Sequence, residues 1–366
     1  MGSGQLGRML THAAHQLGYR VHTYSPESNT PTGQSADLEI VGSYDDLKSI
    51  ENFARSVDVV TFEFENIPAA SVECASAVVP VRPGVQSLHI AQHREREKNF
   101  LSQKNYPTTP YRLVRSAADL EAALGALGLP VVLKTAGMGY DGKGQIRIDR
   151  KEEASKAYAA FGGGEMIAEA WVDFSLEGSV IGARTTQGDF THWGLIENHH
   201  RHHILDVSIL PSSFSVELTA KAIEITRQLM SDLQMVGLLC VEFFVTKTGE
   251  LLVNELAPRP HNSGHLTIDA CITSQFEQQV RAICELPLGD TRLIAKGASM
   301  ANLLGELWEK GEPNWSAALA NPNIKLHLYG KSQARPARKM GHLTVLGESG
   351  PEAAAAVRAA REKLSS

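Results

Sequence analysis

The sequence predicts an α/β protein that begins with a parallel sheet and continues with an antiparallel one. Helix-like and strand-like hydrophobic patterns alternate from the first residues, which is typical of parallel α/β sheets. From residue 131 to residue 255 the pattern changes to strands and hairpins, which indicates antiparallel pairing. With 366 residues, 43% of them hydrophobic, the chain is long enough for two or three domains.

Composition argues against several classes of protein. The chain has neither an apolar run of about 18 residues nor a signal-peptide pattern, so we expect a cytoplasmic protein without a membrane partner. The formal net charge of −6 gives no general attraction for nucleic acids, and we expect none as a partner. Four isolated cysteines indicate neither a zinc knuckle nor a disulfide framework.

The first 90 residues are predicted to form one unit. Residues 5–17 have helical spacing of apolar side chains, and residues 19–24 follow as a strand. A polar loop covers residues 25–33, and a helix is expected around residues 44–56. Residues 57–64 have the continuous apolar character of a buried strand.

The rest of the chain is predicted to contain both helices and strands. One long helix is expected to interrupt the antiparallel region, and the chain is expected to close on two strands and an Ala-rich helix. The expected helices span residues 92–104, 117–127, 216–233 and 352–364, and the expected strands include residues 131–134, 146–148, 241–246, 251–255, 324–329 and 342–346.

Residues 2–7 (GSGQLG) match the G-x-G-x-x-G pattern of dinucleotide-binding turns. The match is incomplete, because only Met1 stands where a strand is needed, and residues 24–26 (YSP) replace the expected acidic ribose ligand. We expect a shortened or misassigned start of the chain and a tight turn near a small substrate's phosphate, with Gln5 and Leu6 as substrate-binding candidates. A dinucleotide site is the alternative.

Glu63 lies with Glu65 and Asn66 where the predicted strand 57–64 ends. The carboxyl ends of parallel strands face the ligand crevice, so Glu63 is a candidate for substrate binding. Solvated loop carboxylates are the alternative.

The segment 133–145 (LKTAGMGYDGKGQ) is rich in glycine and lysine directly after an apolar strand. Glycine lets backbone amides approach phosphoryl oxygens, and lysines add positive charge. A Walker loop is excluded, because Gly144 replaces the magnesium-binding Ser or Thr and residues 146–148 continue as a strand. We expect a hairpin that lies over a nucleotide, with a surface loop as the alternative. The candidates are Lys134, Gly139, Tyr140, Asp141, Gly142, Lys143, Gly144 and Gln145.

A short apolar run leads into a second nucleotide-binding candidate. An extended backbone beside apolar side chains can hydrogen-bond an adenine edge, and a carboxylate a few residues later can accept ribose hydroxyls. The candidates are Glu169, Ala170, Trp171, Val172 and Glu177.

Two β-rich runs, 241–246 and 251–255, are separated by a hairpin signal. With a two-residue loop, Glu242 would lie opposite Glu255 on the neighbouring strand. Like charges across strands repel by roughly 0.2–1 kcal/mol, so the pair calls for a cation. With Asn254 adjacent, the oxygen ligands suit magnesium rather than zinc. A one-residue bulge would undo this register.

The segment 257–265 (APRPHNSGH) follows this hairpin and is rich in hydrogen-bond donors, which suits an anion site. An ordinary polar loop is the alternative. Among the histidines at 199–203, one imidazole that contacts ATP is expected rather than a zinc site. Basic side chains from Lys331 to Lys339 form a local phosphate-binding candidate, with a solvated loop as the alternative.

Four segments closely resemble the 5-(carboxyamino)imidazole ribonucleotide synthase family of ATP-grasp enzymes in purine biosynthesis. They are residues 2–10 (GSGQLGRML), Lys134 with residues 139–145 (GYDGKGQ), residues 253–265 (VNELAPRPHNSGH) and residues 338–343 (RKMGHL). The glycine-rich hairpin and the paired glutamates are general to ATP-grasp ligases, whereas the last two segments point to this family. The resemblance covers nearly the whole chain.

The resemblance implies an α/β ATP-grasp fold with an N-terminal parallel-sheet (Rossmann-like) domain and a small C-terminal β-rich domain. The implied domains are 1–92, 93–285 with a nucleotide-binding subdomain at about 93–172, and 286–366. The implied assembly is a homodimer.

The resemblance also implies roles for individual residues. ATP would be bound by Arg94, Lys134, Gly139, Tyr140, Asp141, Gly142, Lys143, Gly144, Gln145, Glu169, Ala170, Trp171, Val172, Glu177, His200, Asn254 and Glu255, and magnesium by Glu242 and Glu255. Arg259, His261, Lys331 and Arg338 would position bicarbonate and the ribose phosphate, with Glu63, Tyr140 and Asp141 near the aminoimidazole. Lys143 stands where arginine is frequent and His203 where glycine is frequent.

The implied reaction is the carboxylation of aminoimidazole ribonucleotide by bicarbonate and ATP through carboxyphosphate, which closure of the glycine hairpin would shield from water. A formate-dependent ribonucleotide transformylase, a nicotinamide dehydrogenase and a nucleotide-sensing module without catalysis remain alternatives.

Overall fold

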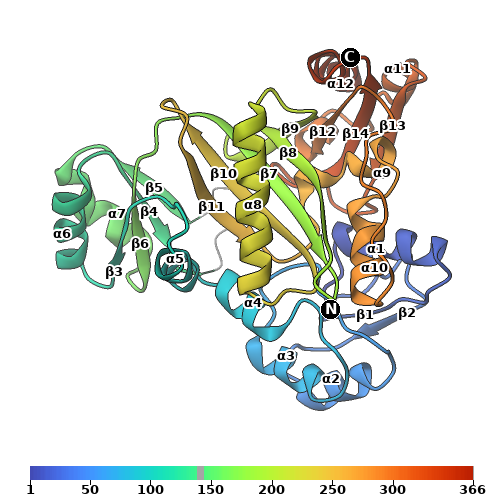
Figure 1. The fold of residues 1–366 in the computed structure, drawn as a ribbon, viewed down its shortest axis with the longest axis horizontal. Helices are drawn as coiled ribbons and strands as arrows, with labels where there is room; N and C mark the ends of the chain where they lie inside the picture. The colour runs from blue at the N-terminus through green and yellow to red at the C-terminus, as the bar shows by residue number, and fades with distance from the viewer. Residues whose placement is uncertain (138–143, 366) are drawn as a thin grey trace.

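The computed structural model describes residues 1–137 and 144–365 (Figure 1). Its strands form a two-stranded, a four-stranded and an eight-stranded sheet. The predicted change from parallel to antiparallel pairing is confirmed, because β1 and β2 are parallel whereas all named strand pairs of the two larger sheets are antiparallel. No helix among the described residues is long and apolar enough to cross a membrane.

The amino-terminal unit surrounds a short parallel sheet. Its elements are α1 (Gln5–Gln16), β1 (His22–Ser25), β2 (Leu38–Val41), α2 (Leu47–Ala54), α3 (Ala69–Ser76) and α4 (Val85–Ala91). Residues 57–64, predicted as a strand, form only an isolated parallel bridge from Val60 to Val81. The Met1 amino group donates to the Thr61 carbonyl at 2.6 Å, so the first residue lies beside this segment. Val60 and Phe62 of this segment are buried in the core, as expected from the sequence, whereas Val57, Val59 and Phe64 are only partly buried.

The second sheet has four strands, in the order β3-β6-β4-β5. Its strands are β3 (Tyr111–Val114), β4 (Val131–Thr135), β5 (Gln145–Ile148) and β6 (Met166–Ala170), and its neighbours are α5 (Arg94–Gln103), α6 (Ala117–Leu127), η1 (Lys151–Glu153) and α7 (Ala154–Ala160). Lys134 pairs with Gln145 across β4 and β5, so the predicted glycine-rich hairpin is confirmed at its base.

The eight-stranded sheet forms the centre of the molecule, in the order β11-β10-β7-β8-β9-β12-β14-β13 (Figure 1). Helix α8 packs on one face, and η2, α9 and α10 pack on the other. The strands are β7 (Phe174–Arg184), β8 (Phe190–Arg201), β9 (Ile204–Leu210), β10 (Gly237–Thr246), β11 (Leu251–Ala257), β12 (Gly297–Leu304), β13 (Ile324–Leu328) and β14 (Lys339–Gly347). The helices are α8 (Val216–Asp232), η2 (Asn262–Gly264), α9 (Thr267–Ala270), α10 (Gln275–Ile283), η3 (Gly305–Trp308), α11 (Trp315–Leu319), α12 (Gly350–Glu362) and η4 (Lys363–Ser365).

The β10–β11 hairpin differs from the prediction in its loop but not at its acidic pair. Thr246 N–H donates to the Glu250 carbonyl, so the loop has three residues rather than two. This shifts the strands by one residue, and Phe243 pairs with Val253. A bulge then places one extra residue, Asn254, on β11 and restores the pairing of Glu242 with Glu255. The predicted register at the two glutamates is therefore confirmed.

Candidate active site

A cavity of about 1170 Å³ is lined by residues from the amino-terminal unit, the four-stranded sheet and the eight-stranded sheet. It gathers residues that are up to 334 positions apart in the chain, from Gln5 to Lys339. The sequence-predicted residues among its lining are Gln5, Leu6, Glu63, Arg94, Lys134, Gln145, Glu169, Ala170, Trp171, Val172, Glu177, His200, Glu242, Asn254, Glu255, Arg259 and His261.

Some predicted residues lie elsewhere. Lys331 and Arg338 are not among the residues that line this cavity: the Lys331 Nζ donates to the Lys339 carbonyl at 2.7 Å, and Arg338 donates to a carbonyl in its own loop. Lys339, the last residue of the predicted basic patch, does line the cavity. Gly144 lies at the base of the glycine-rich hairpin outside the lining, and the predicted residues Gly139, Tyr140, Asp141, Gly142 and Lys143 lie outside the described residues.

Glu242 and Glu255 lie directly opposite each other on neighbouring strands and both line the cavity. Directly opposed residues of an antiparallel pair point to the same face, so their carboxylates share one site. The Nε2 of His261 lies 3.0 Å from Glu242, and Arg94 lies 3.6 Å from Glu255. Burial favours the neutral acid, but the hydrogen bond from His261 and the positive charge of Arg259 outweigh burial and lower the pKa of Glu242 below its usual range.

These residues fit a hard divalent cation. Two carboxylates and the amide of Asn254 offer oxygen ligands of the kind that magnesium prefers. The two carboxylates lie side by side, and His261 and Arg94 from other elements of the structure lie close to them. Glu242 and Glu255 would hold the ion.

A buried ion-pair network lies beside the acidic pair. The Lys134 Nζ donates to Glu169 at 2.7 Å, and the Lys98 Nζ lies 3.8 Å from the same carboxylate. Burial alone would raise the pKa of Glu169, but the charges of Lys134 and Lys98 lower it to about 2. Lys98 also donates to Thr108 at 2.8 Å and to the Asn254 carbonyl at 3.2 Å. The network therefore joins β4, β6, α5 and the bulge of β11.

The residues Glu177 and His200 form a hydrogen-bonded pair on β7 and β8. The Nδ1 of His200 lies 2.7 Å from Glu177. Beside them, His202 and His203 form a two-residue turn in which both have positive φ, +52° and +64°. Such turns favour glycine, which gives a physical reason for the glycine that the family resemblance implies at position 203.

One part of the cavity is aromatic. The rings of Phe174 and Phe244 stack with centroids 4.7 Å apart and an interplanar angle of 11°. The guanidinium of Arg147 lies 4.1 Å from the centre of the Trp171 ring. Phe174, Phe244 and Arg147 were not predicted as site residues, although all three line the cavity. This surface suits a flat heterocycle.

The amino-terminal glycine turn holds a carboxylate of the protein itself. Glu63 accepts hydrogen bonds from the backbone N–H groups of Gly4 and Gly7, at the start of α1. The position where a dinucleotide phosphate would lie is therefore filled by an acidic side chain. Nearby, Arg259 donates through two nitrogens to Glu65. This pair joins the loop that follows β11 to the amino-terminal unit.

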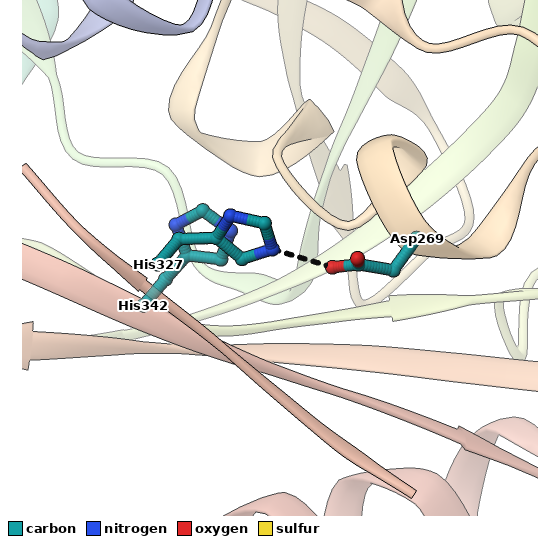
Figure 2. A group of neighbouring side chains, drawn as sticks. All are labelled: Asp269, His327 and His342. Carbon is teal, nitrogen blue, oxygen red and sulfur yellow. Dashed lines mark hydrogen bonds and ion pairs between the residues drawn. The ribbon is translucent and has the colours of Figure 1, made fainter.

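Asp269, His327 and His342 form another group of potential metal ligands among the described residues (Figure 2). The His327 Nε2 lies 2.8 Å from Asp269, and the His342 Nδ1 lies 2.9 Å from the hydroxyl of Tyr329. The two imidazole rings stack at 4.5 Å and 12°, so their in-plane lone pairs run nearly parallel and do not converge on one ion. We assign this group to packing between α9 and the strands β13 and β14.

Sequence reasoning missed the buried charges of α5. Lys98 and Glu97 are almost completely buried, and Glu97 accepts a hydrogen bond from the Leu256 N–H, next to Glu255. Burial, together with the negative charge of Glu255, raises the pKa of Glu97. In the sequence these residues lie in a helix whose many charges are typical of a solvated surface. No local pattern distinguishes the two buried charges from the exposed ones.

Family models match three parts of the chain. Residues 1–92 match the ribonucleotide synthetase preATP-grasp domain, residues 99–276 the ATP-grasp domain, and residues 298–356 the phosphoribosylaminoimidazole carboxylase C-terminal domain. The chain is therefore an ATP-grasp enzyme.

Individual proteins define the family more closely. The N5-carboxyaminoimidazole ribonucleotide synthases of Bacillus subtilis and Brucella melitensis are 42% and 44% identical over 94% of this chain, and the matches cover 90% and 94% of those proteins. The chain belongs to the N5-carboxyaminoimidazole ribonucleotide synthase family, which confirms the resemblance seen in the sequence.

Solved structures agree with this assignment. The Staphylococcus aureus enzyme in complex with ADP has a TM-score of 0.93 and 34% identity, covering 98% of this chain and 95% of that one. The Aspergillus clavatus enzyme in complex with ADP and 5-aminoimidazole ribonucleotide has a TM-score of 0.90 and 28% identity, covering 100% and 97%. The expected ATP-grasp fold class is thereby confirmed.

Proposed function

We propose that this protein carboxylates 5-aminoimidazole ribonucleotide with bicarbonate and ATP, giving 5-(carboxyamino)imidazole ribonucleotide, ADP and phosphate in purine biosynthesis. The names of its relatives and the ligands of the Aspergillus clavatus structure support the substrates. The observation that carries the proposal is the pair Glu242 and Glu255, which line the same cavity as Lys134 and His261.

ATP is proposed to bind between the two larger sheets. The adenine would lie at the aromatic surface near Phe174 and Phe244, and its edge would meet the backbone of residues 169–172. Glu177, oriented by His200, would accept the ribose hydroxyls. Lys134 and Arg94 would bind the phosphates, where their positive charges stabilise the charge on the transferred phosphoryl group. Residues 139–145 are proposed to bind ATP as well.

The chemical step is proposed to take place at the acidic pair. Magnesium held by Glu242, Glu255 and Asn254 would supply the positive charge that neutralises the ATP phosphates. Arg259 and His261 would orient bicarbonate for attack on the terminal phosphoryl group, giving carboxyphosphate. The amine of the ribonucleotide then takes the carboxyl group, and phosphate leaves. Exclusion of water protects the intermediate from hydrolysis.

The ribonucleotide is proposed to bind on the side of the amino-terminal unit. Glu63 is held by the start of α1 and lines the cavity, as do Gln5 and Leu6. Lys339, at the start of β14, adds a cation to the cavity lining, where the ribose phosphate would lie. The predicted phosphate contacts of Lys331 and Arg338 would require their loop to rearrange when substrate binds.

The proposal is tested by measuring ADP formation with each substrate left out in turn. We expect full turnover only with ATP, magnesium, bicarbonate and aminoimidazole ribonucleotide together. Labelled bicarbonate should enter the product, whereas labelled formate should not. Incorporation of formate would identify a transformylase instead, and ATP binding without phosphate release under any combination would indicate a sensing module.

Glu255→Gln should abolish phosphate release while the fold is retained, because one carboxylate of the proposed metal site becomes neutral. The exposed Glu250→Gln, directly after the loop of the same hairpin, is the matched control and should keep normal turnover. Turnover is measured by phosphate release and the fold by circular dichroism. Near-normal turnover of Glu255→Gln would contradict the metal assignment.

We also propose a homodimer in the cytoplasm. Ile272 and Ile294 are 52% and 59% exposed, and the backbone bonds of Ile294 to Ala270 and of Ile272 to Arg292 bring them together. This apolar surface suits association with a second copy of the chain. Sedimentation equilibrium of the purified protein would determine the mass of the assembly.

A further inference from the structure

A chain of buried hydrogen bonds runs across the sheet below the cavity and ends at His261. Ser208 Oγ donates to Asn198 Oδ1 at 3.0 Å, and Asn198 Nδ2 donates to Ser179 Oγ at 2.9 Å. Ser179 Oγ lies 2.7 Å from Ser263 Oγ, which lies 2.8 Å from the Nδ1 of His261. The three serines are completely buried and Asn198 is 4% exposed. The chain therefore connects β9, β8, β7 and η2 away from solvent.

The donors in this chain run in one direction. Ser179 Oγ accepts from Asn198, so its own proton is available for Ser263 Oγ, and the Ser263 hydroxyl then donates to His261. The backbone N–H of Ser263 is also directed at the Nδ1 of His261, at 3.3 Å. A backbone N–H can only donate, so Nδ1 is an acceptor. The neutral ring of His261 consequently carries its proton on Nε2.

The other side of the ring faces the acidic pair. Nε2 lies 3.0 Å from Glu242 Oε1, within the cavity, so the N–H points at an anionic oxygen. The backbone of His261 is held separately by the completely buried Gln275. The amide of Gln275 accepts from the His261 N–H at 2.9 Å and donates to the His261 carbonyl at 2.7 Å. Ring and backbone are thus fixed by different partners.

We propose that Asn198, Ser179 and Ser263 are positioning residues that hold His261 as the Nε2–H tautomer and aim this N–H into the cavity. There it donates to an anionic oxygen: that of Glu242 in the free protein, and that of the one-carbon substrate during turnover. The other tautomer would present a lone pair to the anion and repel it. Only the identity of the substrate oxygen rests on the proposed function, since the tautomer follows from the hydrogen bonds.

The kinetic test compares two equally buried serines. Ser263→Ala removes the hydroxyl that donates to His261, and we expect kcat to fall about tenfold with an unchanged KM for ATP. Ser299→Ala is the matched control, because Ser299 donates to the Ser208 carbonyl at 2.9 Å but takes no part in the chain to His261. Its kcat should stay normal. Ser263→Thr keeps a hydroxyl and should recover most of the lost kcat.

A second measurement reads the tautomer without turnover. Nitrogen NMR of protein labelled with 15N-histidine should show an unprotonated Nδ1 and a protonated Nε2 for His261, whose signals are identified by their loss in His261→Asn. Ser263→Ala should show a mixture of tautomers. A proton on Nδ1 in the wild type, or a Ser263→Ala protein with unchanged spectrum and kcat, would overturn the proposal. The expected spectrum in a protein without turnover would support the positioning chain and overturn the proposed function instead.

Discussion

Glu169 illustrates how a single residue depends on its surroundings. Its carboxylate is buried between two lysines, and those charges lower the pKa to about 2 from an ordinary value of 4.5. A buried carboxylate without such partners would be protonated or would destabilise the fold. Glu169 is therefore charged in the folded protein at every pH above about 2, where it keeps Lys134 in place at the cavity.

The lowered pKa of Glu169 predicts that the stability of the folded protein depends on pH. Because the folded pKa lies below the unfolded one, the stabilisation is complete above about pH 4.5 and is lost as the pH falls towards 2. Glu169→Gln should lower the free energy of unfolding by about 3 kcal/mol at neutral pH, and this difference should shrink between pH 4.5 and 2. Urea unfolding at a series of pH values measures it.

The control for this experiment is Glu165→Gln, one exposed position in the neighbouring loop. Glu165 pairs with Arg115 at the surface, where such pairs contribute little, so its stability should follow the wild type. A difference between Glu169→Gln and wild type that stays constant across the pH range would contradict the assigned pKa.

At the scale of the element, turns and bulges decide which side chains meet. The three-residue loop and the bulge at Asn254 each shift the β10–β11 pairing by one residue, and the two shifts cancel at Glu242 and Glu255. The predicted pairing of Glu242 with Glu255 is therefore correct, although the predicted two-residue loop is wrong. In the β8–β9 hairpin, His202 and His203 adopt positive φ, which costs free energy for any residue except glycine.

His203→Gly should raise the free energy of unfolding by about 1 kcal/mol, because glycine adopts positive φ without the steric cost of a side chain. Arg201→Gly is the matched control in the adjoining strand, where φ is not positive, and it should lower stability. Thermal unfolding of both variants gives the comparison. A less stable His203→Gly protein would show that the imidazole makes compensating contacts.

At the scale of the whole molecule, the cavity exists because separate units dock against one another. The Arg259 to Glu65 pair joins the β11 loop to the amino-terminal unit, and Arg82 joins that unit to the end of α10. Arg82 donates to the Ile283 carbonyl and to Glu285, both at 2.5 Å. We propose domain boundaries near residues 92 and 285, although β12, β13 and β14 continue the central sheet.

Arg82→Met should weaken this docking and raise the KM for the ribonucleotide several-fold, with little change in the KM for ATP. The reason is that the proposed ribonucleotide site includes Glu63 of the amino-terminal unit, whereas the proposed ATP site lies between the two larger sheets. Arg55→Met removes an exposed pair at the end of α2 in the same unit and should leave both constants unchanged. Equal changes in both KM values would argue against separate sites.

The sequence by itself determined the alternation of elements, the acidic hairpin and the family. These features depend on local periodicity and on residues close together in the chain, such as Glu242 to Glu255 and Lys134 to Gln145. Hydrophobic spacing also located α6 at Ala117–Leu127 and the whole of α8. Short helices such as α3 and α4 were missed, because seven or eight residues carry too little periodicity.

Only the tertiary structure decided which charges are buried and what they contact. Lys98, in a helix with the pattern of a solvated surface, reaches Glu169 and the Asn254 carbonyl from distant segments. The tautomer of His261 likewise depends on serines of other strands. Such contacts join residues tens to hundreds of positions apart, and their free energy depends on burial and distance, which no local pattern of the sequence encodes.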